Sequence, residues 1–138
     1  MKRSLKAPAR GKPSAPRQPD RDRYAHVAAA IADVTGEQFF DALTACLVAV
    51  LEAQACFVAE RLIERPGVLR TLAVSIGGEK QPDFEYEHAA APCTRVLEGV
   101  ARIERGGPAP FVRHAPSGLD AIGCYVGVPL TAADGAAV

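Results

Sequence analysis

The sequence predicts an α+β fold in which an antiparallel sheet carries helices on one face. Two apolar patterns with helical spacing come first, within residues 24–52. Two runs rich in strand-forming residues follow, residues 55–63 and 68–76, and a Pro-Gly pair between them predicts a tight turn. Strands joined by so short a turn pair antiparallel, so this order of elements indicates helices on a sheet rather than parallel crossovers.

A basic leader precedes these elements. Residues 1–23 hold eight basic and two acidic residues, although the whole chain of 138 residues has no net charge. Residues 1–20 are rich in Pro, Lys, Arg and Ala and show no hydrophobic period, which predicts disorder. We therefore expect a disordered leader of residues 1–21 and one domain of residues 22–138. Nucleic-acid binding by the leader is the less favoured interpretation, because no aromatic residue lies among its charges to stack on bases.

Two consecutive helices are predicted before the sheet. The first covers residues 24–34, where one helical face is formed by Tyr24, Val27, Ile31 and Val34. The second begins after Thr35 and runs to about residue 52. Thr35 and Gln38 have the spacing of a capping box, in which each side chain bonds a backbone N–H of the other residue. The buried stripe of the second helix is expected to consist of Phe40, Leu43, Leu47, Val50 and Leu51.

The rest of the chain predicts a short helix and two further strands. Residues 79–91 read as a long polar connection after the first hairpin. Pro92 can begin a short helix, which Gly99 ends. Residues 100–105 are predicted to be a third strand and residues 122–130 a fourth, joined by a loop at residues 110–121. The pair Asp134-Gly135 then favours a hairpin turn.

Several segments, taken in order, resemble a bacterial GAF domain. They are EQFFDAL at residues 37–43, ACFV at 55–58, LRTLA at 69–73, FEY at 84–86, APCTRVLEG at 91–99 and CYVGVPL at 124–130, the last followed by Asp134-Gly135. The resemblance covers residues 25–138. It implies a GAF/PAS-like sheet, whose last strand and C-terminal helix would follow the turn at Asp134. Their absence would leave an unpaired edge beside residues 122–130, so either a partner chain completes the fold or the chain is a fragment of a longer sensor, which is the favoured interpretation. A non-functional fragment of a longer sensor histidine kinase is an alternative to the sensory function.

By the same resemblance, the chain is expected to be a sensory domain of a two-component or similar signalling protein, without catalytic activity of its own. A small ligand of unknown identity would bias helix packing, and the flanking helices would pass this bias to a homodimer partner or an output domain. The candidate ligand-binding residues are Phe84, Tyr86, Cys93 and Tyr125, because ligand pockets are mostly apolar with a few polar groups. These residues could equally pack the loops onto the sheet.

The cysteines leave one enzymatic alternative open. Cys93 lies at the start of the short helix, where a helix N-terminus can lower a thiol pKa and favour the reactive thiolate. One lineage of the family that the chain resembles reduces free methionine sulfoxide with clustered cysteines, so the resemblance implies a methionine-sulfoxide-reductase-like redox enzyme with Cys93 as its nucleophile. A small residue filling space beneath the helix is the favoured interpretation. The other three cysteines, Cys46, Cys56 and Cys124, are most simply core residues.

Other functional classes are disfavoured. His26, His88 and His114 fit no metal-ligand spacing and read as surface or loop residues, so no metal site or catalytic residue is assigned. No apolar run is long enough to span a bilayer, and the N-terminus lacks the apolar region of a secretion signal. With scattered cysteines that form no paired motif, the sequence favours a cytoplasmic protein without membrane contact.

Overall fold

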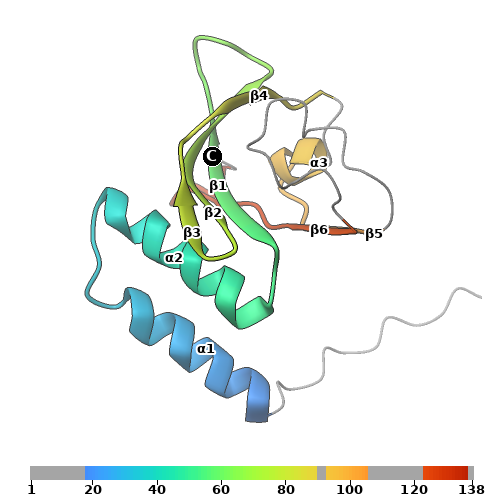
Figure 1. Cartoon of the computed structure of the whole chain (residues 1–138). Coiled ribbons are helices and arrows are strands. Elements are labelled where there is room, and N and C mark those ends of the chain that lie inside the picture. The colour runs from blue at the N-terminus through green and yellow to red at the C-terminus, as the bar shows by residue number, and fades with distance from the viewer. Residues whose placement is uncertain (1–17, 90–92, 106–122, 137–138) are drawn as a thin grey trace, which may run out of the picture.

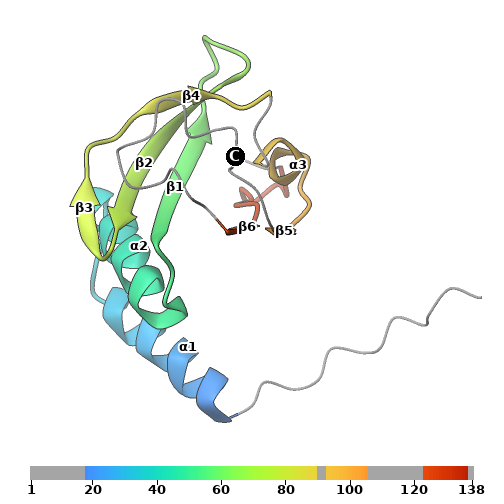
Figure 2. The same ribbon diagram turned by 45° about the vertical axis from the view of Figure 1, so that its right-hand side comes forward.

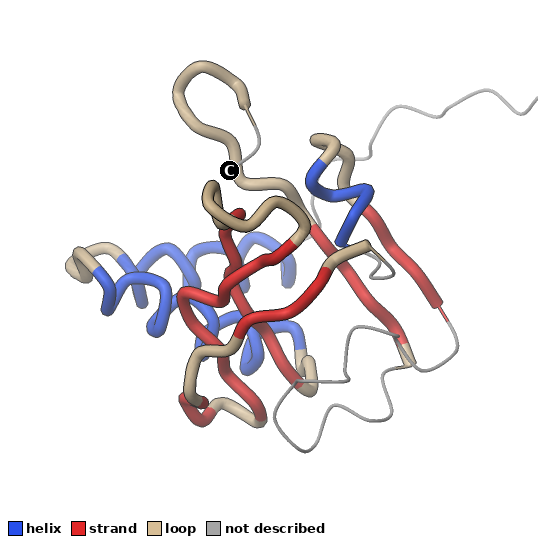
Figure 3. Tube along the Cα trace, turned by 90° about the horizontal axis from the view of Figure 1, so that it is seen from above, coloured by secondary structure: helices blue, strands red, loops and turns tan. Residues whose placement is uncertain are grey.

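The structure, a computed structural model, describes residues 18–89, 93–105 and 123–136. It is a mixed α+β arrangement with antiparallel sheets, as the sequence predicts. Helix α1 (Gln18–Ile31) packs against α2 (Glu37–Leu51), and α2 packs against the main sheet (Figure 1). Figure 2 shows α3 (Cys93–Leu97) and strands β5 (Arg102–Arg105) and β6 (Cys124–Gly127) on the other side of that sheet. Figure 3 shows the same separation from above.

The first helix begins and ends earlier than predicted. It starts at Gln18, so the last residues of the expected leader are helical, and Pro19 occupies the first turn, where a missing N–H costs little. It ends at Ile31, whose carbonyl accepts a hydrogen bond from the Val34 N–H at 3.2 Å. The first 17 residues, where the expected disorder falls, lie outside the described residues.

The start of α2 corrects the predicted capping box. The residue before the helix is Gly36, with φ of 67°, and no side chain caps the helix. Thr35 is therefore one residue too far from the helix for its hydroxyl to act as the cap. The predicted buried stripe is also displaced, because the fully buried residues of α2 are Thr44 and Val48, whereas Leu51 is 61% exposed.

The main sheet has β2 (Val68–Ile76) at its centre. Strand β1 (Ala55–Arg61) pairs with one edge of β2, and β3 (Glu79–Gln81) and β4 (Glu85–Glu87) pair with opposite ends of the other edge, all antiparallel. The predicted hairpin is confirmed, and the Val68 N–H donates to the Arg65 carbonyl at 3.1 Å across the Pro-Gly turn. The two short strands β3 and β4 lie in the segment that the sequence predicts to be a polar connection, so that prediction is wrong.

The third and fourth predicted strands form a separate two-stranded sheet. Strands β5 and β6 pair with each other, and within the described residues neither joins the main sheet. Strand β6 is shorter than predicted and ends at Gly127, two residues before Pro129, which has no N–H to continue a ladder. The expectation of one continuous meandering sheet is therefore corrected to two sheets. The predicted loop at residues 110–121 lies outside the described residues.

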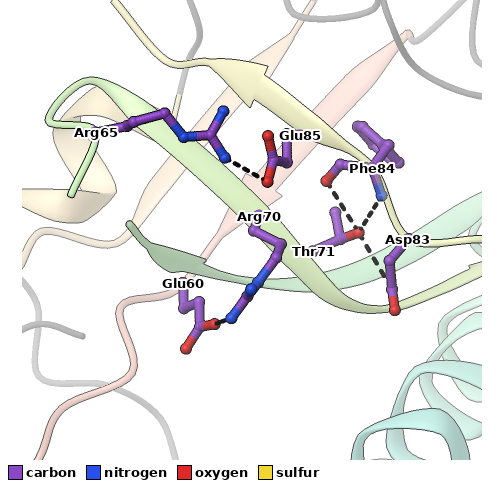
Figure 4. Close-up of polar contacts among 7 residues, drawn as sticks. All are labelled: Glu60, Arg65, Arg70, Thr71, Asp83, Phe84 and Glu85. Carbon is purple, nitrogen blue, oxygen red and sulfur yellow. Dashed lines mark hydrogen bonds and ion pairs between the residues drawn. The ribbon is translucent and has the colours of Figure 1, made fainter. Parts of the chain in front are cut away.

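Buried polar contacts fix β4 against β2. The Thr71 hydroxyl, 1% exposed, accepts a hydrogen bond from the Phe84 N–H at 2.8 Å and lies 3.2 Å from Oδ1 of Asp83, to which it can donate (Figure 4). The Thr71 N–H donates in turn to the Phe84 carbonyl at 3.0 Å. Arg65 and Glu85 form an exposed ion pair of 2.6 Å beside this link. The double contact to Thr71 places residues 84–86 along the edge of β2, where Tyr86 pairs with Leu69.

Candidate functional site

An aromatic cluster covers the face of the main sheet that lies opposite α2. Leu69 of β2 and Tyr86 of β4 are directly paired across the strands, and both are buried. Phe57, Phe84 and Tyr86 pack their rings together, with centroids 5.7–6.5 Å apart. The Phe57 and Tyr86 rings meet edge to face at 87°, which is a favoured geometry for aromatic pairs. These side chains form the floor of the candidate site.

A cavity of about 240 Å³ lies above this floor, and we call it the central cavity. Its walls come from β1, α2, α3 and residues 125–130, and no charged side chain occurs among the described residues that line it. The lining residues that matter below are Leu47, Phe57, Ala59, Tyr86, Cys93 and Tyr125. A mostly apolar cavity with a few hydroxyl and thiol groups has the character of a small-molecule site.

Tyr86 and Cys93 join the sheet to α3. The Tyr86 hydroxyl donates a hydrogen bond to Sγ of Cys93 at 3.8 Å, and Cys93 is 7% exposed. Burial raises the pKa of the Cys93 thiol, and the hydrogen bond from Tyr86 opposes this shift only in part. The lowered pKa that the helix N-terminus suggests is therefore wrong, because α3 has only five residues and its first side chain is buried. A neutral thiol is a poor nucleophile at neutral pH.

Tyr125 enters the cavity from β6. Burial raises the pKa of its phenol, as it does for Tyr86, so both groups remain neutral at physiological pH. The Tyr125 ring packs closely against Gly127. A Cβ atom at Gly127 would lie 2.5 Å from the Tyr125 hydroxyl and 2.6 Å from Cγ2 of Val96.

The structure brings together three of the four residues that the sequence singles out. Tyr86, Cys93 and Tyr125 all line the central cavity. Phe84 does not line it and instead packs behind the wall, against Phe57 and Tyr86. Sequence reasoning missed Phe57 and Val96, which also line the cavity. Alternation in β1 could have indicated that Phe57 faces inward, but no local pattern indicates which loop lies opposite it.

Of the remaining described cysteines and histidines, Cys56 lines the central cavity and the others do not. Cys46 and Cys56 are half-buried and Cys124 is exposed, so the prediction of a core position is wrong for Cys124, which lies on the outer face of a two-stranded sheet. His26 is exposed and His88 half-buried, whereas His114 lies outside the described residues. Among the described residues, no three His, Cys, Asp or Glu side chains gather as a metal site would require.

A second apolar groove, of about 310 Å³, lies between α1 and α2, and we call it the interhelical groove. It is lined on one side by Tyr24, Val27 and Ile31. Leu47 of α2 lines both this groove and the central cavity. A displacement of Leu47 would therefore change the lining of both the central cavity and the interhelical groove.

Comparison with known family models, curated proteins and solved structures gives no match to this chain. In the described part of the chain, no helix is both long and apolar enough to cross a bilayer.

Proposed function

We propose that this chain is a sensory domain of the GAF type, which binds a small molecule in the central cavity and has no catalytic activity of its own. The observation that carries the proposal is the cavity of about 240 Å³ between the aromatic face of the main sheet and α3 with residues 125–130. The sequence resemblance and the helices on the opposite face of the sheet support it. The raised pKa of Cys93 argues against the reductase alternative.

The route from ligand to output runs through α2. This helix packs on β1 and β2 with one side and on α1 with another, and Leu47 reaches both the central cavity and the interhelical groove. A ligand that displaces Leu47 changes the packing of α1, provided that it binds one packing arrangement better than the other. In this account the chain signals by population shift rather than by chemistry.

The partner that we propose is a second copy of the chain or an output domain of a cytoplasmic signalling protein, docked on α1 and α2. Tyr24 and Leu51 lie beside the interhelical groove and are 67% and 61% exposed. Apolar side chains exposed together in this way are typical of interaction sites. Analytical ultracentrifugation of the chain and of Leu51→Glu tests the first possibility, because a dimer formed through this surface should dissociate in the variant.

A ligand screen tests the proposal as a whole. Native mass spectrometry of the purified chain first shows whether a small molecule is retained. A thermal-shift screen of small molecules, charged and uncharged, then compares the wild type with Ala59→Leu, which fills the central cavity, and with Ala49→Leu, which adds the same atoms at an exposed position of α2. Binding should be lost in Ala59→Leu and kept in Ala49→Leu. Hits that persist in Ala59→Leu, or the absence of any hit, would contradict the proposal.

A further inference from the structure

We infer that a second pocket, between the turn that joins β1 to β2 and the helix α3, binds an α-amino acid with an apolar side chain. We call it the hairpin pocket. Its volume is about 430 Å³, within the range of about 300–1,000 Å³ that small-molecule pockets have. Among the described lining residues it shares only Leu97 with the central cavity. The inference therefore concerns another site than the one to which the sensory function is assigned.

Hydrogen bonds to backbone groups hold the walls of the hairpin pocket together. The His88 N–H donates to the Gly67 carbonyl at 3.1 Å, which joins the residues after β4 to the turn. The Thr94 hydroxyl of α3 donates to the His88 carbonyl. The guanidinium of Arg61, the last residue of β1, donates to the Leu97 carbonyl of α3. The walls are thus fixed to one another before a ligand binds, which lowers the entropic cost of binding.

A positive and a negative side chain line the hairpin pocket beside each other. The Arg61 guanidinium bonds the carbonyl of Leu97, the residue before Glu98, so it lies next to the end of α3 that Glu98 follows. Both side chains are exposed, and in the described part of the chain neither forms an ion pair with the other or with a third residue. An α-amino acid carries a carboxylate and an ammonium group on one carbon atom, so it can bind Arg61 and Glu98 at once.

His88 adds a donor for the carboxylate of the ligand. Its Nδ1 is buried and has no hydrogen-bond partner, so Nε2 is the nitrogen through which the imidazole can bond a ligand. Buried N–H groups without a partner are rarer than buried acceptors without one, which favours the neutral tautomer with its proton on Nε2. This N–H can donate to the carboxylate that Arg61 binds.

The rest of the wall is apolar and suits the side chain of the ligand. Leu62 is buried, and Val68 and Leu97 are half-buried beside it. Ile63, at the mouth of the pocket, is 94% exposed. Each methylene group of a ligand that is buried against such a surface raises the affinity about threefold to fourfold. The pocket therefore favours a branched or long aliphatic side chain over a methyl group.

Four probes test the inference on the full chain by calorimetric titration. They are leucine, alanine, N-acetylleucine, which has no ammonium group, and leucinamide, which has no carboxylate. We expect leucine to bind at least about fivefold more tightly than either single-charge analogue, and at least about tenfold more tightly than alanine. Equal binding of leucine and N-acetylleucine would reduce the site to an anion site and overturn the inference.

Matched charge variants locate the two contacts. Arg61→Gln should weaken the binding of leucine and N-acetylleucine but not that of leucinamide, and Glu98→Gln should weaken leucine and leucinamide but not N-acetylleucine. The controls Arg95→Gln and Glu64→Gln remove the same charges at exposed positions outside the lining and should change none of these affinities. Amide spectra check that each variant is folded. Equal losses in the controls would trace the effect to overall charge and would overturn the inference.

Ala59→Leu separates this inference from the proposed function. Ala59 lines the central cavity and not the hairpin pocket, so leucine should bind the variant as it binds the wild type. Loss of leucine binding in folded Ala59→Leu would place the amino acid in the central cavity, which would overturn the inference and leave the sensory function standing. If leucine does not bind the wild type at all, the inference fails, whereas ligands of the central cavity are still tested by the thermal-shift screen.

Discussion

The Tyr86 hydroxyl donates to Sγ of Cys93 at 3.8 Å, and this contact links β4 of the main sheet to the first residue of α3. Both side chains are buried, with exposed fractions of 4% and 7%. The contact therefore lies where the two halves of the cavity wall meet. A change at either residue alters both the walls of the cavity and the packing of α3 on the sheet.

The first prediction concerns the floor of the site. Leu69 is 2% exposed and belongs to the core cluster with Tyr86 and Cys93. Leu69→Ala removes buried methyl groups and leaves a void, so it should lower the free energy of unfolding by about 2–5 kcal/mol. Urea denaturation measures the change. The control is Ile63→Ala, because Ile63 is 94% exposed and its loss should stay within about 0.5 kcal/mol. Equal losses in both variants would contradict the assigned core.

The second prediction concerns the polar link between β2 and β4. Thr71→Val keeps the shape of the side chain but leaves the Phe84 N–H without the hydroxyl oxygen that accepts from it at 2.8 Å. We expect a loss of about 1–3 kcal/mol, the cost of an unsatisfied buried donor. Thr35→Val is the matched control and should cost less than about 0.5 kcal/mol, because no side chain caps α2. A loss of about 1 kcal/mol in Thr35→Val would instead indicate that the Thr35 side chain caps α2, as the sequence predicts.

The third prediction concerns the close packing beside Tyr125. Gly127→Ala places a methyl group within 2.6 Å of two side chains, so the Tyr125 ring or Val96 must move. Overpacking of this kind should destabilise the chain by about 1–3 kcal/mol and shift the Tyr125 ring resonances. A Cβ atom at Gly123 would have no neighbouring atom within 4 Å, so Gly123→Ala should neither destabilise the chain nor shift the Tyr125 ring resonances. Unchanged Tyr125 resonances in Gly127→Ala would show that the ring does not lie where the structure places it.

The fourth prediction is a loss of stability at alkaline pH. Burial raises the pKa values of Cys93, Tyr86 and Tyr125 in the folded chain above the ordinary 9.0 of a thiol and 10.0 of a phenol. As the pH rises through these ordinary values, the unfolded chain releases protons that the folded chain retains, so the free energy of unfolding falls. Below pH 8 these three groups are protonated in both the folded and the unfolded chain, so their contribution to the free energy of unfolding is fully present. Denaturation under reducing conditions at pH 7, 9 and 10 measures it, and Tyr86→Phe should weaken the dependence. Stability that rises from pH 7 to pH 10 would contradict the burial of these groups.

The sequence was sufficient for the strongly patterned elements. The bounds of β2, residues 68–76, agree with those predicted, because a β-rich run there is bounded by the Pro-Gly turn and by Gly77. Strands β3 and β4 were missed because each has three residues, and the only fully buried side chain of β4 is Tyr86. Such short strands depend on the edge of β2, which offers them hydrogen-bond partners, rather than on a pattern of their own.

The residue types that line the candidate site could be predicted from the sequence, but their arrangement could not. Because ligand pockets are mostly apolar with a few polar groups, the sequence indicates Tyr86, Cys93 and Tyr125 as candidates, and all three line the cavity. The same criterion indicates Phe84, which does not line the cavity, because the sequence does not show that Thr71 holds the Phe84 backbone outside the cavity wall. The pKa of Cys93 was misjudged for a similar reason, because the sequence does not show that Tyr86 of β4 and Tyr125 of β6 pack around this thiol and bury it.

Nuclear Overhauser contacts between the full chain and a molecule that binds in the thermal-shift screen test the existence of a ligand cavity most directly. We expect contacts from the ligand protons to Phe57, Tyr86 and Val96, which line the central cavity, and none to Tyr24. Contacts confined to Tyr24 and Leu51 would place the ligand in the interhelical groove instead, and would contradict the claim that the aromatic face of the sheet is the binding site.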